Sequence, residues 1–281
     1  MALTSDMRQA PTSIERKHVV ADDGMTFYYH EIAGAPKSPT LITHGFGANG
    51  GAAAAMTFSA LARDAGLRVI GISFRSMGEN AAGNAVPMSI ERAARDLHAV
   101  ISMVHVDSQD SRVAVFGNSI GANVLWRYAD LFGEEYVDRY IFVDQPVCVQ
   151  KSFEGRQPIP GLVDRLRSSD SSEDHQFANL IEDSESTDNT ERIPRCIHRP
   201  CLVYGGEASF VPHSIENARW IASHVNGPAR ILIYPKPYGT HSPQKEEAQL
   251  RFCGDVAVFL ATPEDDLRGE EKPIEQYSID P

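Results

Sequence analysis

The chain has 281 residues, of which 42% are hydrophobic and 23% are charged, so it can bury a sizeable core, and its length suits one α/β unit. The formal net charge of −12, with no run of Lys and Arg, argues against a nucleic-acid partner. No apolar run approaches the roughly 20 residues that span a bilayer, and the four cysteines lack metal-ligand spacing, so we expect a cytoplasmic protein without a metal or a membrane partner.

The pattern of apolar residues predicts strands and helices in alternation. Residues 1–14 are polar and are expected to form a flexible N-terminal tail. Strands are predicted at residues 17–20, 25–31, 40–43, 68–74, 112–117, 139–143, 201–204 and 231–234. Helices are predicted to end near Ala65 and to cover residues 89–104, 212–224 and 244–260. This alternation predicts an α/β fold with a mostly parallel eight-stranded sheet, helices on both faces, and function at the carboxyl ends of the strands.

The alternation fails in residues 145–198, which interrupt a core made of residues 15–144 and 199–261. Two groups of apolar residues with helical spacing lie there, separated by acidic runs. We interpret this insertion as a small lid of short helices, with a surface loop as the alternative. Its predicted apolar contacts are Ile159, Leu162, Val163, Leu166, Phe177, Leu180 and Ile181. Residues 262–281 are acidic and contain prolines, so we expect a C-terminal tail there.

A G-x-S-x-G pentapeptide, residues 117–121, joins the fifth predicted strand to a helix. β-branched and aromatic residues before it predict a buried strand, and helix-spaced apolar residues follow it. The sharp turn forces strained backbone angles and admits only small residues on either side, which accounts for the two glycines. Such a turn presents the serine oxygen at the end of a sheet, with a helix N-terminus behind it. Ser119 is therefore the predicted nucleophile.

A serine nucleophile predicts a histidine base late in the chain, because a serine hydroxyl is unreactive until a base takes its proton. Of the ten histidines, only His241 stands in a loop directly after the last predicted strand. The others lie in or beside predicted strands and helices, or at the insertion. His241 is therefore the predicted base.

The acid that orients this histidine has two candidates. In the usual arrangement of a serine, a histidine and an acid on such a sheet, the acid is an Asp that follows the seventh strand. Here Ser209 stands where that Asp is expected. Asp144 ends the preceding strand and can reach the same histidine from there, so we prefer it. Glu207 is the alternative acid. The order Ser119, Asp144, His241 matches the chain order of this architecture.

The developing oxyanion requires backbone N–H donors. Ile120, directly after the serine, supplies one, and the glycine-containing loop after the third strand supplies the other, from Phe46. In the same loop, His44 is expected to brace the backbone, with a catalytic role as the minor alternative. Gly45 and Gln145 are predicted to line the substrate pocket.

The pentapeptide, the HGFG sequence at residues 44–47 and the GTH sequence at residues 239–241 together resemble the α/β-hydrolase superfamily, over roughly residues 17–260. Within it, residues 125–146 resemble cofactor-free haloperoxidase-like serine esterases and hydrolases of fungal toxin and polyketide pathways. This resemblance implies an α/β-hydrolase fold and a Ser-His-Asp mechanism on an ester, lactone or thioester. It also implies no cofactor. By the same resemblance, Ser119 excludes the dehalogenase and epoxide hydrolase branches, whose nucleophile is an Asp.

Two other functions stay open. The scaffold can host a lyase or cyclase of natural-product assembly, in which Ser119 and His241 act only as acid and base. Alternatively, the chain is a small-molecule-binding protein that has lost catalysis, a reading that gains weight if neither Asp144 nor Glu207 can reach His241. A small-molecule ester or lactone is the expected partner, and a homodimer is possible.

Overall fold

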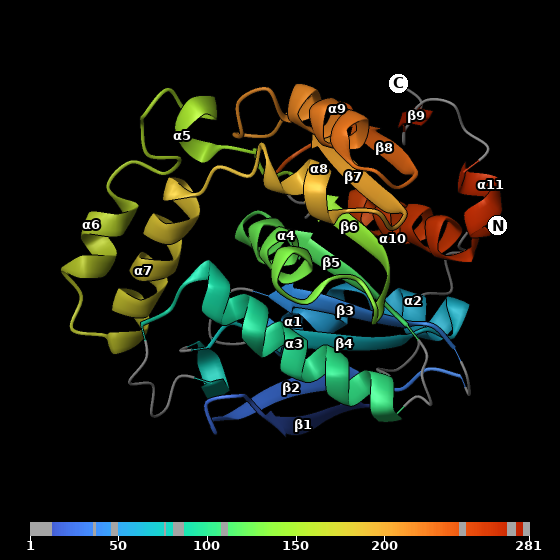
Figure 1. Cartoon of the computed structure of the whole chain (residues 1–281), viewed down its shortest axis with the longest axis horizontal. Helices are drawn as coiled ribbons and strands as arrows, with labels where there is room; N and C mark the ends of the chain where they lie inside the picture. The colour runs from blue at the N-terminus through green and yellow to red at the C-terminus, as the bar shows by residue number, and fades with distance from the viewer. Residues whose placement is uncertain are drawn as a thin grey trace.

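The computed structural model describes residues 13–35, 38–45, 50–75, 77–80, 87–107, 112–241, 246–268 and 274–277. In these ranges nine strands form one sheet, in the order β1-β2-β4-β3-β5-β6-β7-β8-β9 (Figure 1). They are β1 (Ile14–Val20), β2 (Thr26–Ile32), β3 (Thr40–Gly45), β4 (Arg68–Ser73), β5 (Val113–Asn118), β6 (Val137–Val143), β7 (Cys201–Gly206), β8 (Ala229–Tyr234) and β9 (Ile274–Tyr277). The pairs β1–β2 and β2–β4 are antiparallel, and all the others are parallel.

All eight predicted strands are present, and the predicted mostly parallel sheet is confirmed. The ninth strand, β9, lies within residues 262–281 and pairs with β8, so that Tyr277 stands opposite Ile233. Its four residues, IEQY, have too few apolar positions to show a strand pattern. Pairing with β8 is therefore what makes this segment a strand.

Helices cover both faces of the sheet (Figure 1). One face is covered by α1 (Gly50–Thr57), α2 (Ser59–Ala65), α10 (Glu246–Ala261) and α11 (Glu264–Arg268). The other is covered by α3 (Ile90–Asp107), α4 (Ile120–Phe132), α8 (Arg192–Cys196) and α9 (Ser214–His224), and a short 3-10 helix, η1 (Gly78–Asn80), precedes α3. Alternate residues of β5 enter the two cores, with Val113 and Val115 on one face and Ala114 and Phe116 on the other. Such double burial explains why the strand is an unbroken apolar run.

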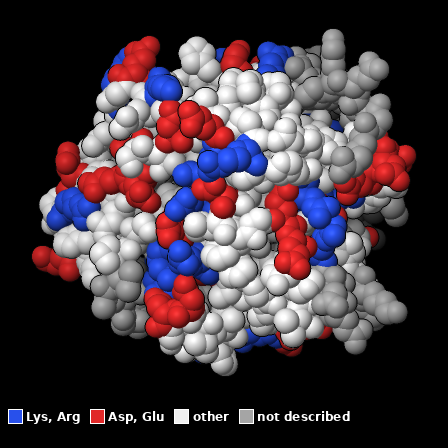
Figure 2. Space-filling model, viewed as in Figure 1, with Lys and Arg blue, Asp and Glu red and all other residues white. Residues whose placement is uncertain are grey.

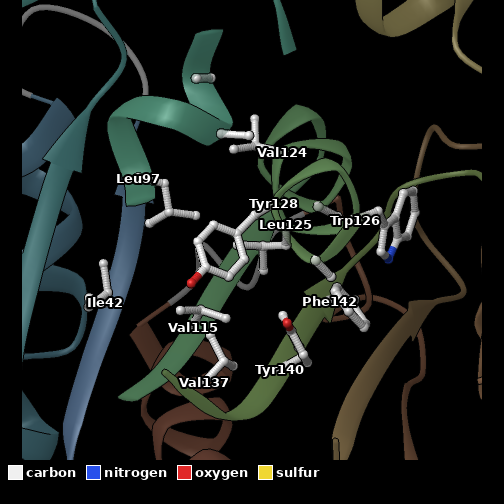
Figure 3. Packing of buried hydrophobic residues seen from close by; sticks show 14 of the residues in the cluster. Ile42, Leu97, Val115, Val124, Leu125, Trp126, Tyr128, Val137, Tyr140 and Phe142 are labelled. Atoms are coloured by element: carbon white, nitrogen blue, oxygen red, sulfur yellow. The ribbon is translucent and has the colours of Figure 1, made fainter. Parts of the chain in front are cut away.

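Helix α4, which begins directly after Ser119, is packed into the core (Figure 3). Leu125 and Tyr128 lie over Val115 of β5. On another side of the helix, Trp126 contacts Phe142 of β6, with ring centroids 5.6 Å apart. Because these side chains are almost fully buried, the position of the helix that follows the serine is fixed by packing.

The insertion between β6 and β7 forms three further helices, α5 (Val149–Ser152), α6 (Leu162–Arg167) and α7 (Ser172–Ser186), before it ends in α8. Figure 1 shows α6 and α7 at one side of the molecule, away from the sheet. Buried hydrogen bonds anchor α7 to α4. The Asn123 side chain of α4 donates to Ser184 Oγ of α7 at 2.6 Å and accepts from Asn189 Nδ2 at 2.9 Å. The insertion is therefore attached to the helix of the G-x-S-x-G turn.

Acidic and basic side chains are interspersed on the face seen in Figure 2. Ion pairs also join neighbouring helices. Asp130 of α4, for example, accepts hydrogen bonds from Arg127, Arg192 and Arg195, which links α4 to α8. In the parts of the chain that the structure describes, no helix combines the length and the apolar character needed to cross a membrane.

A buried ion-pair cluster ties the β1–β2 turn to α3. The Arg75 side chain is 1% exposed and binds Asp96 of α3 at 2.6 Å and Asp23 of the turn at 2.5 Å. Arg92 also binds Asp96, at 3.0 Å. The hydrogen bond from Arg75 is the main reason that the pKa of Asp23 is lowered to about 2. Arg75 therefore binds two carboxylates, and it shares one of them, Asp96, with Arg92.

The turn between β5 and α4 is strained. Ser119 has φ 53° and ψ −127°, a backbone conformation that residues other than glycine rarely adopt. Two hydrogen bonds hold it: the Ser119 N–H donates to the carbonyl of Val143 at 2.9 Å, and the Ser119 carbonyl accepts from the Ala122 N–H at 2.8 Å. A Cβ on Gly117 would lie 2.5 Å from the backbone of Gly121, so the first glycine is required for space. A Cβ on Gly121 meets only His44, at 3.6 Å, which is an ordinary contact.

We predict that Arg75→Met lowers the free energy of unfolding by about 3 kcal/mol, because it leaves a buried carboxylate short of a cation. Urea denaturation at neutral pH measures this loss. Arg156→Met is the control, because the Arg156 side chain is 78% exposed, and it should change stability by less than about 0.5 kcal/mol. Equal effects of the two substitutions would show that the buried cluster adds nothing to stability.

We predict that Gly117→Ala and Gly121→Ala differ in stability, although both glycines belong to the same motif. Gly117→Ala should cost about 2 kcal/mol or more, because its methyl group meets backbone atoms that cannot move without displacing α4. Gly121→Ala should fold like the wild type. Thermal unfolding of both variants compares them, and an intact Gly117→Ala protein would contradict the close approach of β5 to α4.

Candidate active site

A cavity of about 310 Å³ lies at the carboxyl ends of four neighbouring strands. Each strand is followed by a residue that lines it: Ser119 after β5, Gln145 after β6, Phe210 after β7 and His241 after β8. The four residues lie close together because the strands run parallel and end at the same edge of the sheet. The predicted nucleophile and the predicted base therefore line the same cavity.

The insertion forms the opposite wall. Of its predicted apolar contacts, Ile159, Leu162, Phe177 and Ile181 line the cavity. Val163 and Leu166 instead pack between α6 and α7, and Leu180 is buried in the main core. Sequence reasoning missed other lining residues from this segment, namely Pro146, Val149, Phe153, Pro158, Ser184 and Glu185.

Asp144 is the carboxylate that contacts His241. Its Oδ2 lies 2.8 Å from His241 Nδ1, and its side chain is fully buried. Asp144 itself has φ 49°, so a second unusual backbone conformation occurs beside the cavity. Glu207, the alternative acid, is exposed and accepts from the backbone N–H of Lys236 at 3.2 Å. Of the two candidate acids, the structure brings only Asp144 to the histidine.

Two serine hydroxyls complete the hydrogen bonding of the Asp144 carboxylate. Ser209 Oγ donates to Oδ2, the same oxygen that binds His241, and Ser214 Oγ donates to Oδ1. Both hydroxyls are themselves held, since Ser209 Oγ accepts from the Val211 N–H and Ser214 Oγ accepts from the Gly206 N–H, each at 2.9 Å. Ser209 thus occupies the expected place of an Asp and binds an Asp on the neighbouring strand. In the sequence, the only indication of this contact is that Ser209 stands where an Asp is expected after the seventh strand.

Three further contacts fix the His241 loop. Asn118, the residue before the serine, donates from Nδ2 to the carbonyl of His241 at 3.0 Å. The rings of Phe210 and His241 have centroids 4.4 Å apart, so the loop after β7 packs on the imidazole. Tyr204 donates to the carbonyl of Thr240 at 2.7 Å. These contacts hold the imidazole, 21% exposed, at the cavity wall.

The predicted oxyanion donors are only partly described. Ile120 lines the cavity as the first residue of α4, and no described residue accepts a hydrogen bond from its backbone N–H. Gly45 ends β3, opposite Ser73 of β4. Phe46 lies outside the described residues. The backbone N–H of Ile120, at the start of a helix, is therefore available to a ligand.

His44 is a buried neutral side chain at the end of β3. Both ring nitrogens are buried and have no hydrogen-bond partner among the described residues. Burial lowers its pKa to about 3, so the ring carries no charge near neutral pH. Its ring packs on Phe74, with centroids 5.1 Å apart. The expected bracing of the loop after His44 stays a prediction, because residues 46–49 lie outside the described residues.

The arrangement supplies the hydroxyl of Ser119, the imidazole of His241 and the buried carboxylate of Asp144. These are the groups that a serine nucleophile, its base and its orienting acid provide in acyl transfer. The Asp144 bond to Nδ1 leaves Nε2 as the nitrogen available to accept a proton. Within the described ranges, no group of three or more His, Cys, Asp or Glu side chains is placed to hold a metal ion. The Ser119, His241 and Asp144 side chains themselves offer nucleophilic and acid–base chemistry.

Comparison with known proteins identifies the same architecture. A protein-family model described as the alpha/beta hydrolase fold matches residues 39–168. An esterase from Exiguobacterium antarcticum is 16% identical and superimposes with a TM-score of 0.68, covering 87% of this chain and 99% of its own. No curated protein sequence matches the chain.

Two further solved structures are similar over nearly their whole length. A thermophilic esterase from Thermogutta terrifontis is 16% identical, with a TM-score of 0.65 and coverage of 88% of this chain and 98% of its own. A meta-cleavage product hydrolase from Pseudomonas fluorescens is 16% identical, with a TM-score of 0.59 and coverage of 87% and 97%. Together with the sheet order and the strained turn at Ser119, these likenesses show that the chain has the α/β-hydrolase fold.

Proposed function

We propose that this chain is a serine hydrolase that cleaves a carboxylic ester, lactone or thioester through an acyl-enzyme. The observation that carries the proposal is the hydrogen bond from His241 to the buried Asp144, in a cavity that also contains the strained Ser119. The esterases and the hydrolase with similar structures support it as relatives in fold. The alternative of a lapsed binding protein gains no weight, because a carboxylate does reach His241.

In this mechanism, Ser119 Oγ attacks the substrate carbonyl while His241 Nε2 accepts its proton. Asp144 accepts from Nδ1–H, which fixes the imidazole tautomer and stabilises the imidazolium that forms. The protonated histidine then donates to the leaving alcohol or thiol. Water, activated by the same histidine, attacks the acyl-enzyme and releases the acid.

The oxyanion that forms in both steps requires N–H donors. We assign one to the backbone of Ile120, at the N-terminus of α4, where the helix dipole also favours negative charge. The second is assigned to Phe46, as the sequence predicts. We further propose that the insertion acts as a lid, because Leu162 and Phe177 form a wall of the cavity opposite the serine.

The finer resemblance to haloperoxidase-like esterases and to hydrolases of toxin and polyketide pathways stays a prediction. So do the cytoplasmic location, the homodimer, and the alternative of a lyase or cyclase on the same scaffold. The lyase alternative differs in one intermediate, because it forms no bond between Ser119 and the substrate. An acyl-enzyme trapped during turnover would therefore exclude it.

Hydrolysis of p-nitrophenyl esters of several acyl lengths tests the proposed machinery. We expect Ser119→Ala and Asp144→Asn each to lower kcat by about 10⁴-fold, because the nucleophile or the correct tautomer is lost. A fluorophosphonate should label the wild type and leave Ser119→Ala unlabelled.

Glu207→Gln is the matched control for Asp144→Asn, because it removes the same charge from the alternative acid. It should stay within about twofold of the wild type, since Glu207 contacts the backbone of Lys236 and not His241. If Glu207→Gln lost activity and Asp144→Asn kept it, the assignment of the acid would be wrong. If the wild type neither hydrolysed any ester nor reacted with the fluorophosphonate, the serine hydrolase itself would be rejected.

A second prediction uses the position of Ser209. Its hydroxyl donates to the same Asp144 oxygen that binds His241, so a carboxylate at position 209 can reach the imidazole. We expect the double variant Asp144→Asn/Ser209→Asp to recover at least about tenfold in kcat over Asp144→Asn, as a relocated acid restores the tautomer. Asp144→Asn/Ser209→Asn is the uncharged control, and equal rates for the two double variants would refute the relocation.

A further inference from the structure

One charged side chain of the insertion faces the cavity. Among the described residues that line it, Glu185 is the only carboxylate, and none is a Lys or Arg. Most of the others on the insertion side are apolar, such as Phe153, Leu162 and Phe177. An acid in such surroundings is costly to keep charged unless it meets a cation or a hydrogen-bond donor.

Helix α7 directs Glu185 to the cavity by its periodicity. Phe177, Ile181 and Glu185 are four residues apart and form one stripe of the helix, and Ser184 lies beside them. A stripe that served only to pack would continue with an apolar residue at position 185. At position 185, a carboxylate therefore stands where packing alone would favour an apolar side chain. It lies on the face of α7 that lines the cavity.

Glu185 has no hydrogen bond or ion pair to any residue that the structure describes, whereas two neighbouring acids on α7 do have partners. Glu182 binds Arg167, and Asp183 accepts from the Ile90 N–H at 2.7 Å. Burial, and the charge of Glu182, raise the pKa of Glu185. The carboxylate is thus half-buried without a compensating group of the protein.

The wall that carries Glu185 is anchored to α4. Ser184, the preceding residue, is buried and bonded to Asn123 of α4, which is bonded in turn to Asn189. An acid on an anchored helix attracts a ligand cation without the backbone first being ordered. Aromatic rings attract cations as well, and Phe177 lies on the same stripe of the helix.

We propose that Glu185 is a specificity residue that selects esters carrying a cationic ammonium group at a distance from the reacting carbonyl. This inference rests on the proposed hydrolase function. In it, the carbonyl lies at Ser119, the cation lies against Glu185 and the faces of nearby aromatic rings, and the apolar lining contacts the carbon chain between them. Glu185 takes no part in the chemical steps.

Pairs of esters that differ only in charge test the proposal. In one pair the cation is on the acyl side, as the p-nitrophenyl ester of trimethylammoniobutyrate against its tert-butyl isostere. In the other it is on the alcohol side, as butyrylcholine against its tert-butyl isostere. We expect the wild type to prefer the cationic member of at least one pair by about tenfold in kcat/KM, which corresponds to about 1.4 kcal/mol. Glu185→Gln should abolish that preference.

Glu173→Gln is the matched control, because this acid is on the same helix but does not line the cavity. It should keep the wild-type preference. The proposal is overturned if neutral esters are hydrolysed and the preference for charge in Glu185→Gln equals that of the wild type. In that outcome the proposed hydrolase function would still stand, provided that hydrolysis of the neutral esters is lost in Ser119→Ala.

Binding to the Ser119→Ala protein gives a readout that does not need catalysis. Titration calorimetry with the same ester pairs should show tighter binding of the cationic member, and Ser119→Ala/Glu185→Gln should lose the difference. If no ester is hydrolysed but this difference is present, the hydrolase function fails and the cation site stands. If the difference is absent as well, both are rejected.

Discussion

The buried carboxylate of Asp144 joins the segments on which the site depends. Its side chain has no exposed surface, and it accepts hydrogen bonds from His241 after β8, Ser209 after β7 and Ser214 at the start of α9. A carboxylate without water is stable only when its lone pairs meet donors. The ends of β6, β7 and β8 are therefore held in one arrangement by a single side chain, and that arrangement sets the orientation of the imidazole.

The strained turn at Ser119 depends on packing in the same way. The backbone angles of Ser119 are unfavourable on their own, and within the turn the hydrogen bond from the Ala122 N–H to the Ser119 carbonyl offsets part of this cost. Burial of α4 between α3 and the sheet supplies the stabilisation, with Trp126 and Tyr128 almost fully enclosed. The hydrogen bond from Ser119 to the carbonyl of Val143 then connects the turn to β6, the strand that Asp144 follows.

The core and the insertion have different tasks in this chain. The strand ends carry the groups of the proposed mechanism, whereas α6 and α7 provide much of the opposite cavity wall. The buried bonds of Asn123 to Ser184 and Asn189 connect the two. Because Asn123 lies in α4, the helix that starts directly after Ser119, these bonds connect the position of the pocket wall to that of the proposed nucleophile.

The eight strands, the strained turn and the placement of His241 could be predicted because each depends on neighbours in the chain: apolar runs, glycines beside a serine, and a loop that follows a strand. The residues that complete the site could not. Ser209 and Asp144 are 65 residues apart in the chain. The β9 segment forms a strand by pairing with β8. In the sequence, nothing distinguishes Glu185 from the other acids of its acidic segment. Local sequence determines which elements form, and only tertiary packing decides which side chains share a cavity, because contacts between distant residues leave no periodic pattern.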